Sequence, residues 1–327
     1  MFKRPRLSAQ NRLVNALPGL ALLFIASACS GPSETPEIAP ETTTPPPVVE
    51  GLTLPAVWNT GELDAPIRSI GVAGELGSTI AVAYDDGGLQ FFNFEGDRIT
   101  DKADLGAAQL GDGRYLLLSG VPVTVFPGVD TSGNMKVYIH GGQLPEPLAY
   151  DLDTGVDTAI AGLCTAPPTA ESDGVLRLAF WTQNNPNVLV SGRIVQVGEE
   201  LVFLPDEPVT ADRPITACLL SETGATVHSA PILAAAKLER RGKTHVITLD
   251  SSGQYTVIGT DGSSETISIR DGISVKAPKL PTDMTGTGDT RGGGYPGGIL
   301  IIAGEDHNGD NRLIFIDPGV LTLTAFE

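Results

Sequence analysis

A short run of acidic and amide side chains near the end of the chain has the residue types that bind calcium. Residues 305–311 read EDHNGDN and place oxygen-bearing side chains at alternate positions from Asp306 onward. Carboxylate and amide oxygens are the hard ligands that Ca²⁺ takes. The run is not an EF-hand loop, because the required glycine would fall on Asn311 and no helix is predicted on either side. A hairpin turn explains the same residues, so both interpretations stay open.

Other acidic residues that could bind a metal lie in or beside predicted turns. Aspartate is common in turns because its side chain hydrogen-bonds the local backbone, so we expect most of these residues to have that role. The candidate metal ligands are Asp64, Asp85, Asp283, Glu305, Asp306 and Asp310. Calcium is the cofactor that such oxygen ligands favour, and no other cofactor is expected.

The sequence lacks the other common catalytic patterns. Its four histidines do not have the spacing of a helical zinc site. No Gly-x-Ser-x-Gly nucleophile elbow occurs. The two tryptophans, Trp58 and Trp181, are expected to pack in the core or between neighbouring sheets rather than to stack on a ligand.

The N-terminal residues indicate export. Four cations lie within the first twelve residues, before an apolar run at 20–25 and small residues at 26–28. This order is typical of a secretion signal, and the apolar run is too short for a stable membrane-spanning helix. We therefore predict a signal peptide at residues 1–28.

Cys29 directly follows the expected cleavage site, behind Ala26, Ser27 and Ala28. A cysteine at this place resembles the lipobox of bacterial lipoproteins, in which the thiol receives a diacylglycerol before cleavage. The resemblance implies a lipid anchor at Cys29 that tethers the chain to a membrane of the bacterial cell envelope, with the folded part on the extracytoplasmic, periplasmic side. An ordinary Ala-x-Ala cleavage site that happens to precede a cysteine is the alternative.

Residues 29–50 are rich in proline, threonine and glutamate and have almost no large apolar side chain. Such a segment cannot bury enough surface to offset its loss of conformational entropy, so we expect an extended, disordered linker. Residues 51–327 remain as one folded domain, a length that closed all-β folds reach as a single unit. The formal net charge of −18 argues against nucleic acid as a partner, because that binding depends on cations that neutralise phosphates.

Strand and turn patterns alternate through the expected domain. β-branched and apolar runs at 78–84 and 89–94 flank an Asp-Asp-Gly-Gly turn, and the same pattern returns at 244–269 and 298–317. The only candidate helix is the short Ala-rich piece at 234–240. Units of about 40 to 50 residues predict an all-β fold, a β-propeller of about six four-stranded blades. A pair of β-sandwiches or a parallel β-helix is the alternative architecture.

Five segments, in three groups that follow the order of the family along the chain, resemble motifs of the β-propeller phytases. They are LDAPI at 63–67 with DDGGL at 85–89, GLC at 162–164 with TACLLSETG at 216–224, and LPTDMTG at 280–286. The resemblance covers most of residues 60–320 and implies a propeller. It also implies calcium ions held by carboxylates at the top of the propeller, phosphate bound to those ions, and attack on phosphorus by a metal-activated water.

At the positions that this family uses for chemistry, the chain departs from the motifs. The family's lysine falls on Asp85, and two of its glutamates fall on Thr216 and Thr285. Of its paired aspartates only Asp64 remains, beside Leu63. Aspartate repels phosphate where lysine attracts it, and a neutral hydroxyl is a weaker calcium ligand than a carboxylate. The resemblance therefore implies a site that has lost most of its family's ligands.

Two cysteines, Cys164 and Cys218, remain besides Cys29. The oxidising compartment of an exported protein permits a disulfide between them, which would close a loop of about 54 residues. Each lies near the start of a predicted blade, and adjacent blades place equivalent strands side by side. Two buried free thiols are the alternative.

Two functions remain open from the sequence. The first is a membrane-tethered, non-catalytic propeller that binds or scaffolds, with an envelope protein or a small phosphorylated ligand as its candidate partner. The second is a calcium-dependent phosphatase of the phytase type with a rearranged site. The two threonines at glutamate positions favour the first, and the turn carboxylates keep the second open.

Overall fold

The computed structural model describes residues 51–74, 78–166, 174–221, 224–240, 243–259, 261–288 and 295–322. They belong to one compact unit, Val49–Glu327. The expected signal peptide, Cys29 and the linker at 30–50 lie outside the described residues. Within the described ranges, no helix is long and apolar enough to cross a membrane.

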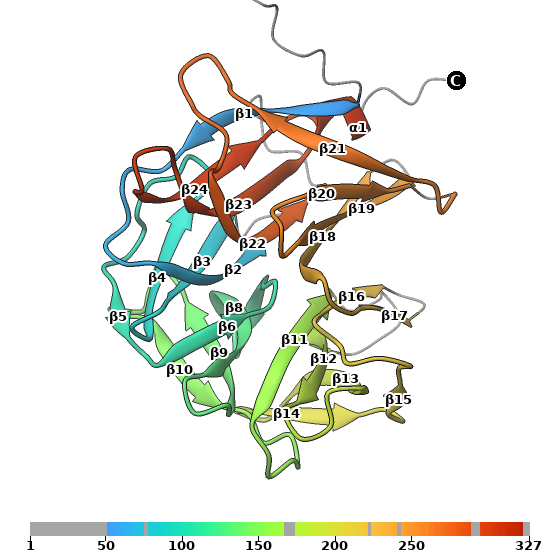
Figure 1. The fold of residues 1–327 in the computed structure, drawn as a ribbon. Helices are drawn as coiled ribbons and strands as arrows, with labels where there is room; N and C mark the ends of the chain where they lie inside the picture. The colour runs from blue at the N-terminus through green and yellow to red at the C-terminus, as the bar shows by residue number, and fades with distance from the viewer. Residues whose placement is uncertain are drawn as a thin grey trace, which may run out of the picture. The chain divides into compact units, whose positions relative to one another are not determined.

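Antiparallel strands that follow one another in the chain form the first sheet (Figure 1). Its strands, in spatial order, are β2 (Ile67–Ala73), β3 (Thr79–Tyr84), β4 (Gly88–Asn93) and β5 (Ala103–Asp104). All six residues of β3 are buried, which explains its continuous run of apolar and β-branched residues. In the turn that follows, Gly87 has a φ of +83°, a conformation that glycine adopts without strain.

Three further sheets follow along the chain. Their strands are β6 (Ala107–Leu110), β7 (Arg114–Leu118), β8 (Val121–Asp130), β9 (Met135–His140), β10 (Leu148–Asp151), β11 (Ile160–Ala166), β12 (Leu176–Thr182), β13 (Val188–Val197), β14 (Glu200–Pro205), β15 (Val209–Thr210), β16 (Ala217–Ser221) and β17 (Gly224–His228). The second sheet has the order β10-β9-β8-β6, and β7 also pairs with β8. The third has the order β11-β12-β13-β14, and β15 also pairs with β13. In the described part of the chain, β16 and β17 form a two-stranded sheet.

The last sheet contains strands from both ends of the domain. They are β18 (Ile232–Arg240), β19 (Lys243–Asp250), β20 (Tyr255–Ile258), β21 (Ser264–Arg270), β22 (Leu280–Thr287), β23 (Ile299–Glu305), β24 (Asn311–Ile316) and β1 (Leu52–Asn59). The order is β18-β19-β20-β21-β1-β24-β23-β22. β1 pairs in parallel with β21 and antiparallel with β24, so the first strand of the domain completes the last meander.

The successive meanders are arranged around one axis, with β2, β6, β11, β16, β18 and β22 innermost (Figure 1). Apolar clusters fill the space between neighbouring sheets, as where Phe91 of β4 lies against Phe126 of β8 with ring centroids 5.6 Å apart. This radial arrangement is a β-propeller, as the sequence predicted. The number of six blades stays a prediction, because β16 and β17 are the only strands of their sheet in the described ranges.

The one helix among the described residues is short, α1 (Gly319–Thr322). The Ala-rich candidate helix at 234–240 is instead part of β18, so that interpretation is wrong. Its residues alternate between buried and partly exposed positions and pair along their length with β19. Pairing and packing of a strand therefore override the helix propensity of alanine.

Candidate functional site

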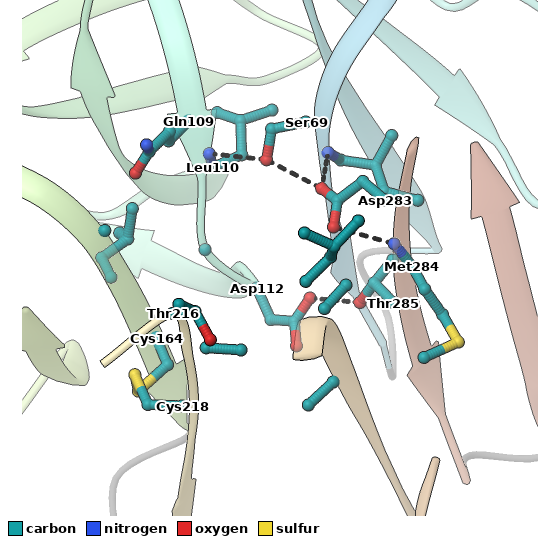
Figure 2. Close-up of a pocket in the computed structure, with 18 of the residues that line it drawn as sticks. Ser69, Gln109, Leu110, Asp112, Cys164, Thr216, Cys218, Asp283, Met284 and Thr285 are labelled. Atoms are coloured by element: carbon teal, nitrogen blue, oxygen red, sulfur yellow. Dashed lines mark hydrogen bonds between the residues drawn. A yellow bond between two sulfur atoms is a disulfide. The ribbon is translucent and has the colours of Figure 1, made fainter. Parts of the chain in front are cut away.

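The inner strands enclose a cavity of about 270 Å³ on the axis of the propeller, here called the axial cavity. Figure 2 shows it in close-up, with residues from all six inner strands or their ends around it. Two carboxylates line it, those of Asp112 and Asp283. Five hydroxyl side chains accompany them, those of Ser69, Thr165, Thr216, Thr282 and Thr285, and Arg68 adds a cation to the lining.

Asp283 of β22 joins β22 to β2. Its Oδ2 accepts hydrogen bonds from Ser69 Oγ and from Ile70 N, each at 2.9 Å, and its Oδ1 accepts one from Met284 N at 2.8 Å (Figure 2). Ser69 Oγ in turn accepts a hydrogen bond from Leu110 N of β6 at 3.2 Å. One carboxylate and one hydroxyl thus connect three neighbouring inner strands.

Asp112 lies two residues after the end of the inner strand β6 and connects β6 to strands on both sides. Its Oδ1 accepts hydrogen bonds from Val72 N at 3.0 Å and from Thr285 Oγ1 at 2.6 Å. Its backbone carbonyl accepts a hydrogen bond from Thr165 Oγ1 of β11 at 2.6 Å. The residue therefore contacts β2, β11 and β22.

Burial raises the pKa of both carboxyl groups. The pKa of Asp283 rises to about 6, because burial outweighs the hydrogen bonds from Ile70, Met284 and Ser69, and the nearby charge of Asp112 raises it further. Burial likewise raises the pKa of Asp112, although its hydrogen bonds and the charge of Lys237 act in the opposite direction. Each carboxyl group in this cavity therefore holds its proton more tightly than it would in water.

Further side-chain links close the ring of inner strands. Gln109 Nε2 donates to Ala161 O at 2.9 Å between β6 and β11, and the Cys164–Cys218 disulfide links β11 to β16. Thr216 Oγ1 donates to Ile232 O at 2.6 Å between the start of β16 and β18. Arg240 Nη1 donates to Gly288 O at 3.3 Å between β18 and the end of β22. With Asp283 and Ser69, every neighbouring pair of inner strands is linked. The polar side chains at the axis therefore serve first as cross-links.

The axial cavity brings together some of the candidate residues that were predicted from the sequence. Asp283, Thr216, Thr285 and both cysteines line it. Cys164 and Cys218 form a disulfide with a Cα–Cα distance of 5.6 Å. The hydroxyls at the two glutamate positions of the phytase motifs are hydrogen-bond donors to protein oxygens, Thr285 to Asp112 and Thr216 to Ile232.

Asp64 and Asp85 are not among the residues that line the axial cavity. Asp64 forms an exposed ion pair with Arg98, at 3.0 Å between Oδ1 and Nη2. Asp85 is exposed in the turn after β3, where its backbone N–H donates to the carbonyl of Pro66 at 3.0 Å. The structure thus separates these two candidate ligands from Asp283.

Asp306, at the centre of the candidate calcium run, has a role that recurs elsewhere in the fold. Its Oδ1 accepts hydrogen bonds from the amides of Asn308 and Asp310, and Gly309 has a φ of +86°. Asp130 and Asp250 do the same in the turns β8–β9 and β19–β20, each with a positive-φ glycine three residues later. In each of these Asp-x-x-Gly turns, the carboxylate of the aspartate takes the place of a backbone carbonyl as the acceptor for amides of the turn.

The rest of the candidate calcium run is also bonded within the protein. Arg312 Nε lies 2.7 Å from Asp306 Oδ2, and its Nη2 lies 2.7 Å from Asp310 Oδ2. Burial alone would raise the pKa of Asp306, but the amide donors and the guanidinium group of Arg312 hold it below its usual range. Glu305 is the last residue of β23 and pairs with Asn311 of β24. These contacts agree with the hairpin interpretation of the run.

These contacts allow a test of whether the residues present could hold a calcium ion. Among the described residues, no group of three or more histidine, cysteine, aspartate or glutamate side chains is placed to hold a metal. Ca²⁺ takes six to eight oxygen ligands. The axial cavity has two carboxylates, and N–H and O–H donors already bond both oxygens of Asp283 and Oδ1 of Asp112. The residues present therefore do not form a ready calcium site.

Sequence reasoning missed Asp112, which lies between Gly111 and Gly113. A Cβ added at Gly111 would lie 2.6 Å from the side chain of Thr165, and one at Gly113 would lie 2.5 Å from the carbonyl of Val125. Both positions need glycine because neighbouring strands approach the backbone closely. A lone aspartate between two glycines was the available signal, and it also fits an ordinary turn.

Comparison with known proteins identifies the fold and no family. No protein-family model matches the chain, and no curated protein matches it. A mutant of AofleA from Arthrobotrys oligospora is similar in structure, with 13% identity, a TM-score of 0.51, and coverage of 79% of this chain and 86% of that one. This similarity shows the fold alone.

Two other solved structures are less similar. AofleA without the substitutions has 14% identity and a TM-score of 0.49, with 79% of this chain and 85% of that one covered. The β-propeller domain of Cps50 (Swd1) from Myceliophteria thermophila has 12% identity and a TM-score of 0.43, with 77% and 82% covered. The radial sheets and the linked inner strands described above define the class of protein as a β-propeller with a cross-linked axial cavity.

Proposed function

We propose that this protein is a lipid-anchored β-propeller that acts as a non-catalytic binding or scaffolding module on the extracytoplasmic side of the bacterial cell envelope. The observation that carries the non-catalytic part is the bonding of Asp112 and Asp283 at the axial cavity. A carboxylate takes part in catalysis by exchanging protons, by holding a metal or by attacking the substrate. These two carboxylates instead accept hydrogen bonds from buried strands, which favours a structural role.

The lipid anchor is inferred from the N-terminal residues. Cys29 follows small residues at the expected cleavage site, and the proline-rich residues 30–50 would form a spacer. Proline-rich chains rise about 3 Å per residue, so this spacer could hold the propeller tens of ångströms from the membrane. An anchored propeller of this kind would meet partners at the membrane surface.

A Cys29→Ser variant tests the anchor. We expect the unaltered protein in the membrane fraction, with the mass of a diacylglycerol on its N-terminal peptide, and the variant in the soluble fraction. A wild-type N-terminal peptide that begins at Cys29 without added lipid mass would contradict the anchor and leave the propeller interpretation untouched.

An envelope protein and a small phosphorylated ligand are the two candidate partners. The axial cavity favours the first, because two carboxylates, Asp112 and Asp283, line it against one cation, Arg68, where a phosphate would have to enter. Binding to an envelope protein would use the outer surfaces of the blades. Crosslinking in intact cells, compared between the wild type and the unanchored Cys29→Ser variant, would identify such a partner.

A calcium-dependent phosphatase that resembles the β-propeller phytases is the second candidate function. The observation in its favour is that eight oxygen-bearing side chains line one cavity, those of Ser69, Gln109, Asp112, Thr165, Thr216, Thr282, Asp283 and Thr285. A calcium ion that displaced their hydrogen-bond donors could gather several of these oxygens.

A phosphate-release assay separates the two functions. The full-length protein in detergent is incubated with phytate or with simple phosphomonoesters, with calcium and with a chelator. We expect no release above background in either condition. Calcium-dependent turnover that is lost in Asp283→Asn would establish the phosphatase and overturn the non-catalytic proposal.

A further inference from the structure

A second pocket lies away from the axis and has a different chemistry. Its volume is about 380 Å³, and it is lined by Val57, Trp58, Glu95, Tyr295 and Asp317. We call it the outer pocket, because β1, which carries Val57 and Trp58, is the strand of its meander that lies farthest from the axis (Figure 1). Two aromatic rings and two carboxylates therefore meet at one surface site.

Trp58 is exposed because β1 has an irregular register. The pairing with β24 shifts between Ala56 and Trp58, so Val57 and Trp58 both face outward instead of alternating, with 38% and 50% of their surface exposed. Trp58 is therefore not a core residue, although its indole contacts Glu95 in the neighbouring sheet, whereas Trp181 is buried at 5% exposure. An exposed indole next to an exposed valine is an apolar surface that water covers at a free-energy cost.

Both aromatic rings are held in place by hydrogen bonds. The indole Nε1 of Trp58 donates to the carbonyl of Glu95 at 2.7 Å. The hydroxyl of Tyr295 donates to the carbonyl of Phe94 at 3.4 Å, and its ring stacks on that of Phe315 with centroids 6.5 Å apart. The rings are thus oriented before any ligand arrives, which lowers the entropy cost of binding.

The two carboxylates of the outer pocket, Glu95 and Asp317, have no ion-pair partner among the described residues. Asp317 is oriented by one hydrogen bond, from Gly319 N to its Oδ1 at 2.7 Å. Burial raises the pKa of Tyr295, and the charge of Glu95 raises it further, so Glu95 acts on the same space as the ring.

We propose that the outer pocket binds an alkylammonium cation, a group with a positive charge and an apolar surface. Cations are attracted to the faces of tryptophan and tyrosine, and quaternary ammonium groups suit such sites because they have no N–H groups that need acceptors. The carboxylates of Glu95 and Asp317 add long-range attraction for the same charge. An anion would be repelled by both carboxylates, and a neutral apolar ligand would make no use of them.

Calorimetric titration of the full-length protein in a neutral detergent tests the proposal with two probes of one shape. The probes are choline and its neutral isostere, in which carbon replaces the ammonium nitrogen. We expect saturable binding of choline, quenching or shift of Trp58 fluorescence, and binding of the isostere weaker by about tenfold or more. Equal binding of both probes, or no saturable binding of choline, would overturn the proposal.

Two variants locate the site. Trp58→Leu keeps an apolar side chain and removes the ring, and we expect it to weaken choline binding by about tenfold. Glu95→Gln combined with Asp317→Asn removes the two charges, and we expect about fivefold weakening that disappears at high salt. Undiminished affinity in both variants would overturn the assignment of the site.

A matched control separates local from global charge effects. Glu200→Gln combined with Asp206→Asn removes the same net charge from exposed positions on and beside β14. We expect choline affinity within about twofold of the wild type, because exposed charges more than a Debye length away are screened. An equal loss in the control would mean that net charge, and not the outer pocket, attracts the cation.

Discussion

The axial cavity and the outer pocket each contain two carboxylates, but the fold uses them differently. At the axis, Asp112 and Asp283 accept hydrogen bonds from amide and hydroxyl groups of neighbouring inner strands. At the outer pocket, Glu95 and Asp317 have no ion-pair partner among the described residues and lie beside two fixed aromatic rings. Carboxylates that cross-link neighbouring strands contribute to stability, whereas carboxylates that have no ion-pair partner and link no strands are available to a ligand.

Substitutions in the two regions are therefore expected to have opposite effects on stability and on binding. A change at the axis is expected to lower the free energy of unfolding with little effect on ligands of the outer pocket. A change at the outer pocket is expected to affect binding with little effect on stability. The four predictions below run from the largest expected change in stability to the smallest.

Removal of the disulfide is expected to have the largest effect. Cys164 and Cys218 are 54 residues apart and link β11 to β16, and cross-links over such loops contribute about 4 kcal/mol by restricting the unfolded chain. We expect the variant with Cys164→Ala and Cys218→Ala to unfold at a clearly lower urea concentration. Urea titration followed by circular dichroism measures this. A midpoint equal to that of the wild type would show that the ring of inner strands closes without this link.

The second prediction concerns Asp112, which was missing from the sequence-based candidates. Asp112→Ala leaves the amide of Val72 and the hydroxyl of Thr285 without their acceptor, at a cost of about 2 kcal/mol. Asp112→Asn keeps an acceptor oxygen and is expected to lose less. The exposed Asp212→Ala serves as control, with a change below about 0.5 kcal/mol. Equal stabilities of the Asp112→Ala variant and the control would remove Asp112 from the set of cross-links.

The third prediction is a pH dependence that distinguishes the two regions. Because the pKa of Asp283 is about 6 in the folded protein and near 4 when unfolded, the folded state binds its proton more tightly. This contribution to stability is complete below the unfolded pKa and is lost as pH rises from about 4 to 6. We expect Asp283→Asn to flatten this part of the stability profile, with a difference of about 2 kcal/mol or less.

Urea titrations across that pH range, on the wild type and on Asp283→Asn, measure the slope. Glu95→Gln at the outer pocket is the matched comparison, because it removes one carboxylate from an exposed position outside the axial cavity. A wild-type profile that rises with pH over the same range would contradict the burial of Asp283 as the dominant influence.

The smallest effect on stability is expected from Trp58→Leu. Half of the side chain is exposed, so its loss should lower the free energy of unfolding by about 1 kcal/mol or less while choline binding falls. Urea titration and calorimetric titration on the same sample measure both quantities. A large loss of stability without a change in binding would reverse the comparison, and Trp58 would then belong with the cross-links of the fold.

Much of the secondary structure could be predicted, because its signals are local. The runs at 78–84 and 89–94 are β3 and β4, and the runs in 298–317 are β23 and β24, each within a residue or two of its expected bounds. The Ala-rich piece at 234–240 was the exception, since its environment as an inner strand of a sheet is not local information. The propeller itself followed from the repetition of hairpins.

The candidate site could be predicted only in part. Asp283, Thr216 and Thr285 were singled out from the phytase motifs and do meet at the axial cavity, but Asp64 and Asp85 do not. The calcium interpretation of 305–311 depended on spacing, and the same Asp-x-x-Gly spacing at Asp130 and Asp250 closes ordinary hairpins. Spacing along a chain does not specify whether donors or a cation will satisfy a carboxylate.

By itself, the sequence determined the order of strands and turns and the N-terminal residues from which export and a lipid anchor are predicted, because β-branched runs, Asp-Gly turns and signal segments act through neighbouring residues. Tertiary structure alone decided which polar groups meet. Thr285 and Asp112 are 173 residues apart, and Asp283 is 214 residues from Ser69. A shift of register in one strand exposed Trp58. Contacts of that range arise only when the first strand and the last meander close the ring, and that closure depends on the packing of every sheet between them.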